Sequence, residues 1–263
     1  LHDALPIYPP VVSLDAALRA NIGGWGVVPI GAMPAQNPAQ VQLGRALFFD
    51  KILSGNRDVA CATCHDVTKG MADGRSLAIG TGAVGAGPTR QLGQARHFTQ
   101  RGAPSLLNAG LGLPYMFWDA RLSGRTGSFS TDSGLLLPPN LPNLLAAQAM
   151  LPVLNRREMR GDLGDVDVFG NPNELAKLTD NQQTKVWEGL MDRLLAIDEY
   201  LTLFRAAFPG TVRPRFEDAA RALAVFQMES FTTTRSPFDR YLDRDDLALT
   251  PQEKRGGLLF FGK

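Results

Sequence analysis

The feature that most constrains this 263-residue chain is the run Cys61-Ala62-Thr63-Cys64-His65. In a Cys-x-x-Cys-His run the two thiols lie one helical turn apart and can bond both vinyl groups of a haem, while the imidazole behind them can bind its iron. Cys61 and Cys64 are the only two cysteines of the chain. The motif therefore predicts a covalently bound c-type haem, with His65 on the iron.

Two other uses of a cysteine pair compete with haem attachment. A structural zinc site needs about four ligands, and besides His65 the chain offers only His2 and His97 as imidazoles. A thioredoxin-like dithiol or a structural disulfide stays open, but a redox Cys-x-x-Cys is expected near a βαβ pattern. The sequence shows no such pattern, which favours the haem.

Length and composition limit the remaining choices. With 263 residues, 44% of them apolar, the chain is long enough for one large domain or two small ones with a substantial core. A formal charge of +1, from 27 basic and 26 acidic residues, argues against nucleic acid as a partner. No run approaches the roughly 18 consecutive apolar residues of a membrane span, so we expect no such span. The many Gly and Pro residues predict long ordered loops around the cofactor.

The periodicity of apolar residues predicts a mainly α fold. Asn37-Pro38 is a good helix start, with Asn as N-cap and Pro in the first turn. We place Cys61 to His65 on a short helix, residues 69–94 in a glycine-rich loop and residues 124–142 in an inserted loop, and we predict no strand of any length. Further helices are expected near Pro104, over 144–149, 157–159, 186–194, 198–207 and 216–232, and from Ser236 and Thr250 onward.

Several separate motifs, in one order along the chain, resemble the bacterial di-haem cytochrome c peroxidase family, which includes the MauG-like enzymes. The similarity covers most of the chain from about residue 38 onward, which makes it far more specific than the haem motif alone. Its segments are Leu43 to Asp50, Leu53-Ser54, the haem motif, Pro104 to Ala109, Phe117 to Arg121, Gln148 to Pro152, Glu158-Met159 and Ser236 to Tyr241.

The resemblance implies a two-domain, mostly helical protein with a c-type haem in each domain. The first haem is where peroxide reacts, and the second receives electrons from a partner. On this basis residues 1–36 are an N-terminal extension of unclear role, residues 37–235 the peroxidatic cytochrome c-like haem domain, and residues 236–263 a linker and the start of a second haem domain. We expect the chain to stop before the second haem motif.

The resemblance also assigns roles to individual residues. It implies that His65 is the proximal iron ligand, that Gln148 and Glu158 are the glutamine and catalytic glutamate of the distal pocket, and that Trp118 lies between the two haems. Without the family resemblance, the sequence predicts that Glu158 is an exposed carboxylate at a helix start. It likewise predicts that Trp118 is a core residue. A distal carboxylate can move the protons of peroxide as base and then acid, and a glutamine amide can hold peroxide by hydrogen bonds.

Three departures from the family pattern affect the site. Many members have a histidine in the glycine-rich loop as the sixth iron ligand, but residues 83–94 of this chain contain no histidine. Either His97 takes this role from a shifted loop, or the sixth position of the iron is open. We favour the open position. Gly102 stands where the family often has a calcium-binding Asn, which makes calcium doubtful. Residues 122–147 form a longer insertion than in short members.

The leading functional hypothesis is reduction of hydrogen peroxide to water, with electrons from a c-type cytochrome or a cupredoxin passed through a second haem. One alternative is MauG-like oxidation of a partner protein or small molecule. Another is a plain electron-transfer cytochrome whose iron has both axial positions filled. We expect a periplasmic location, because c-type haem is attached outside the bacterial inner membrane and family members are periplasmic, and a homodimer is a further expectation.

Overall fold

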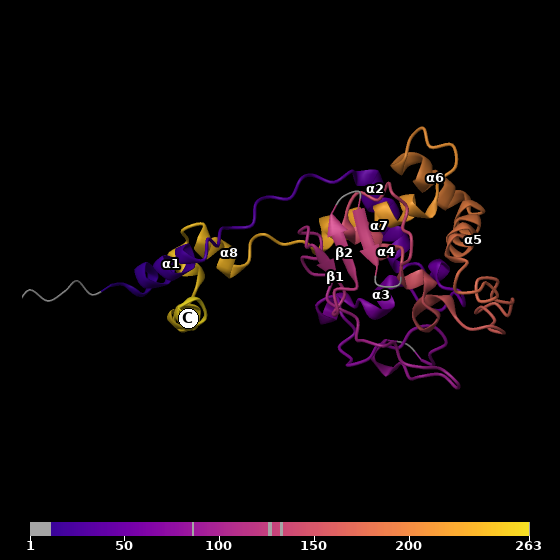
Figure 1. The fold of residues 1–263 in the computed structure, drawn as a ribbon, viewed down its shortest axis with the longest axis horizontal. Helices are drawn as coiled ribbons and strands as arrows, with labels where there is room; N and C mark the ends of the chain where they lie inside the picture. The colour runs from indigo at the N-terminus through magenta and orange to yellow at the C-terminus, as the bar shows by residue number, and fades with distance from the viewer. Residues whose placement is uncertain (1–11, 86, 126–127, 132–133, 263) are drawn as a thin grey trace, which may run out of the picture. The chain divides into compact units, whose positions relative to one another are not determined.

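The computed structural model describes residues 12–262 except 86, 126, 127, 132 and 133 (Figure 1). His2 and the rest of the first eleven residues therefore lie outside the described part. The chain forms two compact units: Ala35–Thr232, and a smaller one that joins Leu1–Pro34 to Thr233–Lys263. The larger unit contains the haem motif and every site residue named above.

Helices α2 (Pro38–Phe49) and α7 (Phe216–Phe231) pack along each other in the middle of the larger unit (Figure 1). The predicted start of α2 is confirmed: the Asn37 side chain accepts hydrogen bonds from the amides of residues 39 and 40, and Pro38 lies in the first turn. Gly44 allows the close approach, because a Cβ there would lie 2.0 Å from the carbonyl oxygen of Ala222. This pair of helices forms one wall of the core on which the site is built.

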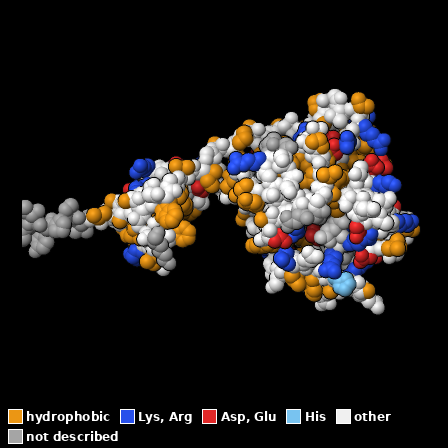
Figure 2. Space-filling model, in the orientation of Figure 1, with side chains coloured by type: hydrophobic (Ala, Val, Ile, Leu, Met, Phe, Trp, Pro, Cys, Tyr) orange, Lys and Arg blue, Asp and Glu red, His pale blue; other side chains and the backbone are white. Residues whose placement is uncertain are grey.

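The remaining elements of the larger unit complete a mainly helical domain, as predicted. Its core is apolar and includes the fully buried Leu43, Leu47 and Phe48 of α2. Acidic and basic side chains are interspersed on the face shown in Figure 2. The other helices are α3 (Cys61–Cys64), α4 (Leu144–Ala149), α5 (Gln183–Leu195), α6 (Asp198–Ala207) and the short helical turns η1 (Lys51–Leu53), η2 (Val67–Lys69), η3 (Gly87–Thr89), η4 (Pro152–Leu154) and η5 (Arg156–Arg160).

A small antiparallel sheet of order β1-β2-β3 contradicts the prediction that no strand forms. Its strands are β1 (Tyr115–Met116), β2 (Leu122–Arg125) and β3 (Ser128–Thr131). Strands of two to four residues are too short to show a period-two pattern, so periodicity could not predict them. The sheet is anchored by the fully buried Leu122, paired with Met116 on one side and Thr131 on the other.

The short helix expected at Pro104 is also wrong. Residues 102–106 are irregular and lead into turns at 107–110, where Asn108 has a left-handed φ of 59°. Its amide donates to the carbonyl of Phe231 at the end of α7. Long-range pairing with α7 therefore replaces the local helix that the proline suggested.

The smaller unit packs α1 (Leu14–Gly24) against α9 (Pro251–Phe261), with α8 (Pro237–Leu242) and η6 (Asp246–Ala248) beside them. Leu18, Ile22 and Tyr241 form its buried core. Lys254 pairs with Asp15 at 2.6 Å, between α9 and α1. Residues 12–34, part of the N-terminal extension for which the sequence suggested no role, thus belong to this unit. No helix in the described ranges is both long and apolar enough to cross a membrane.

Candidate active site

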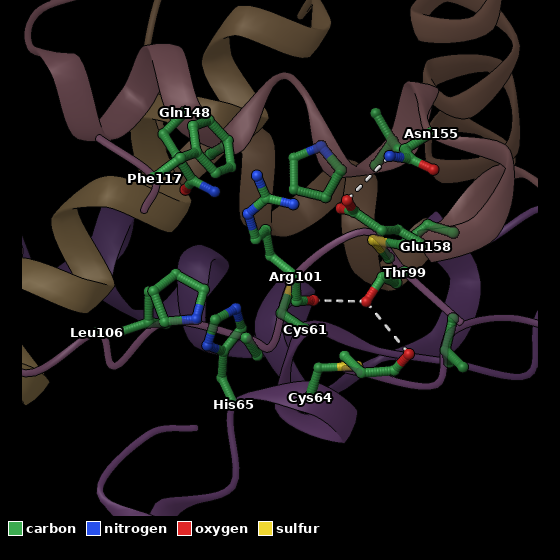
Figure 3. Close-up of a pocket in the computed structure, with 18 of the residues that line it drawn as sticks. Cys61, Cys64, His65, Thr99, Arg101, Leu106, Phe117, Gln148, Asn155 and Glu158 are labelled. Atoms are coloured by element: carbon green, nitrogen blue, oxygen red, sulfur yellow. Dashed lines mark hydrogen bonds between the residues drawn. The ribbon is translucent and has the colours of Figure 1, made fainter. Parts of the chain in front are cut away.

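The candidate active site is a pocket in the larger unit, shown in Figure 3, that brings together segments far apart in sequence. The haem motif forms one side of the pocket, and Cys61, Cys64 and His65 line the cavity. Gln148 and Glu158 line it as well. Apolar side chains supply much of the rest of the wall, namely Phe48, Leu53, Val59, Leu106, Phe117, Val153 and Leu223.

The haem motif is held on the short helix α3, as expected from its sequence. The Thr63 hydroxyl accepts a hydrogen bond from the Ala60 amide at 2.9 Å, which stabilises the start of this single turn. The two cysteines are not joined to each other. Burial raises the pKa of Cys61 to about 12 and that of Cys64 to about 11. A nucleophilic dithiol needs a lowered thiol pKa, so the redox-dithiol alternative is disfavoured.

His65 follows α3 directly, and its ring is fixed by the main chain. Nδ1 lies 2.9 Å from the carbonyl oxygen of Met71, a hydrogen bond in which the ring N–H donates. The loop that places Met71 is closed by a bridge between Asp66 and Ala72. Burial lowers the pKa of His65, which favours the neutral ring. A neutral imidazole that donates from Nδ1 presents the Nε2 lone pair to a metal.

Glu158 lies on η5, a π-helical turn of a kind that is frequent at functional sites. Asn155 fixes this turn in two ways: its side-chain oxygen accepts from the Arg157 amide, and its amide nitrogen donates to Glu158 Oε1, both at 2.9 Å. Gln148 comes from α4 and lines the same cavity (Figure 3). The two residues that the sequence paired thus share one pocket.

The electrostatics of Glu158 suit a proton carrier. Burial raises the pKa of its carboxyl from 4.5 to about 7, and the nearby positive charge of Arg121 opposes this rise only in part. A carboxyl with such a pKa has both protonation states populated near neutral pH. It can therefore accept and return a proton without a large cost in either direction.

Gly80 positions Glu158, and the sequence analysis did not identify it. A Cβ at position 80 would lie 2.0 Å from the Arg157 carbonyl oxygen and 2.7 Å from Glu158 Cα. The next residue, Thr81, donates its amide to the Glu158 carbonyl at 2.9 Å. The glycine-rich loop therefore packs directly on the main chain of η5. No local signal in the sequence points to this contact.

Residues 117–121 form a constrained aromatic turn at the edge of the pocket. Phe117 and Ala120 both have left-handed φ angles, of 69° and 57°. Arg121 holds the turn closed, because its guanidinium contacts both Asp119 carboxylate oxygens at 3.1 Å and lies 3.9 Å above the Phe117 ring. Trp118 is 68% exposed, and its indole N–H donates to the Gly102 carbonyl at 2.9 Å. Trp118 is therefore a residue of the pocket rim and not of the core.

Comparison with known proteins agrees with this geometry. The sequence model described as di-haem cytochrome c peroxidase matches residues 38–247. The chain belongs to the di-haem cytochrome c peroxidase family. Membership implies c-type haem cofactors, and the family resemblance stated from the sequence is confirmed.

The relatives of this chain include a MauG protein and a cytochrome c peroxidase. The chain is 30% identical to the methylamine utilization protein MauG of Methylorubrum extorquens, over 94% of this chain and 54% of that protein. It is 30% identical to cytochrome c551 peroxidase of Pseudomonas aeruginosa, over 82% of this chain and 46% of that protein. The chain thus spans about half the length of these relatives. A crystal structure of a MauG-like protein associated with microbial copper homeostasis shares the fold, with a TM-score of 0.52, 23% identity and coverage of 99% and 55% of the two chains.

The residues of the pocket fit the haem of the family. Two thiols and an imidazole face one cavity, and the walls are largely apolar, as a porphyrin requires. Gln227 adds a polar observation: its amide nitrogen donates to the Leu223 carbonyl, while its buried oxygen has no partner among the described residues. Gln227 lines the same pocket, so a small molecule with a hydrogen-bond donor, bound beside the haem, would satisfy this oxygen, whereas the haem with its ionised propionates has no donor for it.

His97 lies elsewhere. It is exposed and lines a second, polar cavity with Thr81, Arg96 and Arg157, and it is not among the residues that line the haem pocket. Gly102, the position linked to calcium in the family, would place a Cβ 2.6 Å from the Arg75 carbonyl oxygen. Across the described ranges, no group of three or more His, Cys, Asp or Glu side chains is arranged to hold a metal ion.

Proposed function

We propose that the protein, with a haem attached to Cys61 and Cys64 and ligated by His65, reduces hydrogen peroxide to water. The observation that carries the proposal is the position of Glu158, a carboxyl with a pKa of about 7 on the same pocket as the haem motif. The haem, when bound, supplies the iron that takes up peroxide and passes it electrons. The overall reaction consumes one peroxide, two electrons and two protons and yields two waters.

Glu158 moves the proton that makes the O–O bond easy to break. In its ionised form it accepts the proton of one peroxide oxygen, and it then returns this proton to the other oxygen, which leaves as water. Gln148, on the same pocket, donates its amide N–H to the peroxide and to the charge that develops on it. Asn155 keeps the carboxylate aimed by its 2.9 Å hydrogen bond.

The electrons come from outside this chain in our proposal. A small donor protein, either a c-type cytochrome or a cupredoxin, would supply them by way of a second haem outside this chain. Trp118 then relays them, which its exposed position at the pocket rim supports. We place the protein in the periplasm, because its family carries c-type haem.

We further propose that the peroxide side of the iron is open and needs no reductive activation. The support is the position of His97 on another cavity. Replacement of His97 by Gly is expected to leave the peroxide rate of the resting ferric protein unchanged, measured in a stopped-flow instrument without pre-reduction. A large gain in rate for His97→Gly would show that His97 is a gating ligand.

A second candidate function is MauG-like oxidation of a partner substrate, favoured by the 30% identity to MauG. The same pocket residues would then perform the first step with peroxide. Steady-state turnover with a reduced cytochrome distinguishes the two functions. Only a peroxidase takes two electrons from the cytochrome for each peroxide molecule that it consumes. An electron-transfer cytochrome would instead give a low-spin ferric spectrum that does not respond to peroxide or cyanide.

The direct test is Glu158→Gln in the haem-loaded protein. We expect the kcat/KM for peroxide to fall by about 10²- to 10⁴-fold, the usual contribution of a positioned acid-base group. Glu188→Gln, on the exposed face of α5, is the matched control and should keep the full rate. Haem content, from the absorbance of the alkaline pyridine complex, should be equal in all three proteins. An undiminished rate for Glu158→Gln would remove the proposed role.

A further inference from the structure

We propose that Arg101 binds a propionate of the attached haem and thereby raises the reduction potential of the iron. The proposal rests on the haem binding proposed above, but not on peroxide reduction. Arg101 lines the pocket, and Figure 3 shows its side chain reaching into the cavity from the segment that carries Thr99. No role was assigned to it from the sequence.

The main chain of Arg101 is held firmly. Its carbonyl accepts a hydrogen bond from the Thr99 hydroxyl at 2.6 Å, and Thr99 is itself buried. The Thr99 amide also donates to the carbonyl of Ala78, at 3.0 Å. The side chain therefore projects from a fixed point on the pocket wall, where a bound group can meet it without a rearrangement of the main chain.

The guanidinium of Arg101 has N–H donors that can bind a ligand. Nη1 donates to the Gln100 carbonyl at 2.9 Å, and no carboxylate of the described residues lies within ion-pair distance of it. Two nearby arginines differ. Arg121, on the same pocket, is held by Asp119, and Arg90 is buried and donates to the carbonyls of Ile79 and Gly80 at 2.8 Å.

A haem brings two carboxylates into this largely apolar pocket. A guanidinium matches a carboxylate in shape and charge and can bind it through two parallel hydrogen bonds. Glu158 does not compete for Arg101, because its Oε1 is bound by Asn155 and Arg121 is the cation that acts on it. Among the described residues of the pocket, Arg101 is thus the cation available to a propionate.

A positive charge at this position favours the reduced iron, which carries one positive charge fewer than the oxidised iron. Loss of the charge should lower the ratio of reduced to oxidised haem by up to about tenfold at a given potential. For a one-electron couple a tenfold change corresponds to about 59 mV. The effect is independent of turnover, because it is a property of the resting haem.

The test compares Arg101→Gln, Arg101→Lys and Arg213→Gln with the unmodified haem-loaded protein by spectroelectrochemistry and resonance Raman spectroscopy. Arg213 is exposed and paired with Asp192, outside the pocket, so its replacement removes the same charge at a distance. We expect the potential to fall in Arg101→Gln, to stay near that of the parent protein in Arg101→Lys, and not to move in Arg213→Gln. The propionate bending band should shift in Arg101→Gln.

Each contrary result has a distinct meaning. If Arg101→Gln keeps the potential and the bending band of the Arg213→Gln control, Arg101 does not bind the haem. A lower potential with an unchanged bending band would also overturn the propionate contact, since only the charge would then matter. A protein that passes this test but does not turn over peroxide would refute the proposed function and leave the role of Arg101 intact.

Discussion

The two sides of the pocket differ in how far apart their residues lie in the sequence. The haem-attachment side is five consecutive residues, four on the short helix α3 and His65 directly after it, with the His65 ring oriented by the nearby carbonyl of Met71. The side where we propose that peroxide reacts, called the peroxide side below, is assembled from distant segments, with Gln148 on α4 and Glu158 on a π-helical turn that rests on Gly80. The position of the two thiols and of His65 therefore follows from adjacent residues, whereas the placement of Gln148 and Glu158 in the pocket depends on long-range packing.

The largest expected effect is the loss of covalent haem from the haem-attachment side. Replacement of both Cys61 and Cys64 by Ala should abolish covalent haem, because the thiols that bond the vinyl groups are gone. The mass of the acid-denatured protein measures this directly. Glu158→Gln, on the opposite side, is the contrast and should retain one haem per chain. Covalent haem in the double variant would refute the assignment of the motif.

Gly80→Ala should lower the kcat/KM for peroxide and leave covalent attachment of the haem unchanged. An added Cβ would collide with the main chain of residues 157 and 158, so Glu158 must move. A displacement of about 1 Å costs on the order of 10²-fold in rate, and the kcat/KM for peroxide measures it. Gly31→Ala, where a Cβ meets nothing within 4 Å, is the control. A normal rate in Gly80→Ala would mean that the loop does not position Glu158.

The pH profile tests the charge state of Glu158. Its pKa is raised to about 7 in the folded protein, and the ionised form is the base. The kcat/KM for peroxide should therefore be level above pH 7 and fall about tenfold per pH unit below it. The profile is measured from pH 5 to 8.5 with haem content checked at each pH. A rate independent of pH across this range would contradict the proton-carrier role.

A smaller effect is expected from Asn155→Asp. The aspartate keeps an oxygen that can cap η5, but it replaces the N–H donor to Glu158 with a like charge. The pKa of Glu158 should rise further, and the midpoint of the pH profile should move up by about one unit. Asn37→Asp, the same change at the cap of α2, should leave the midpoint in place. An unshifted midpoint in Asn155→Asp would show that this hydrogen bond does not tune the carboxyl.

Sequence reasoning succeeded where the signal is local. The cap at Asn37, the short helix of the haem motif and the later helices follow from residues adjacent in the chain, and the family resemblance supplied the pairing of Gln148 with Glu158. Sequence reasoning failed after Pro104, where a hydrogen bond from Asn108 to the distant Phe231 replaces the expected helix. It also failed for the sheet, whose strands are too short to show a pattern. Gly80 and Arg101 were invisible for the same reason, since their roles depend on partners that only the fold brings near.

The contact at Gly80 has a consequence for engineering. Glycine-rich loops are usual choices for randomised libraries, because their positions are assumed to tolerate any residue. In this chain a Cβ at position 80 would collide with the main chain of residues 157 and 158. On the role that we propose for Glu158, a library that includes position 80 should mostly return variants with intact haem and little turnover. A selection for haem colour alone would keep those variants.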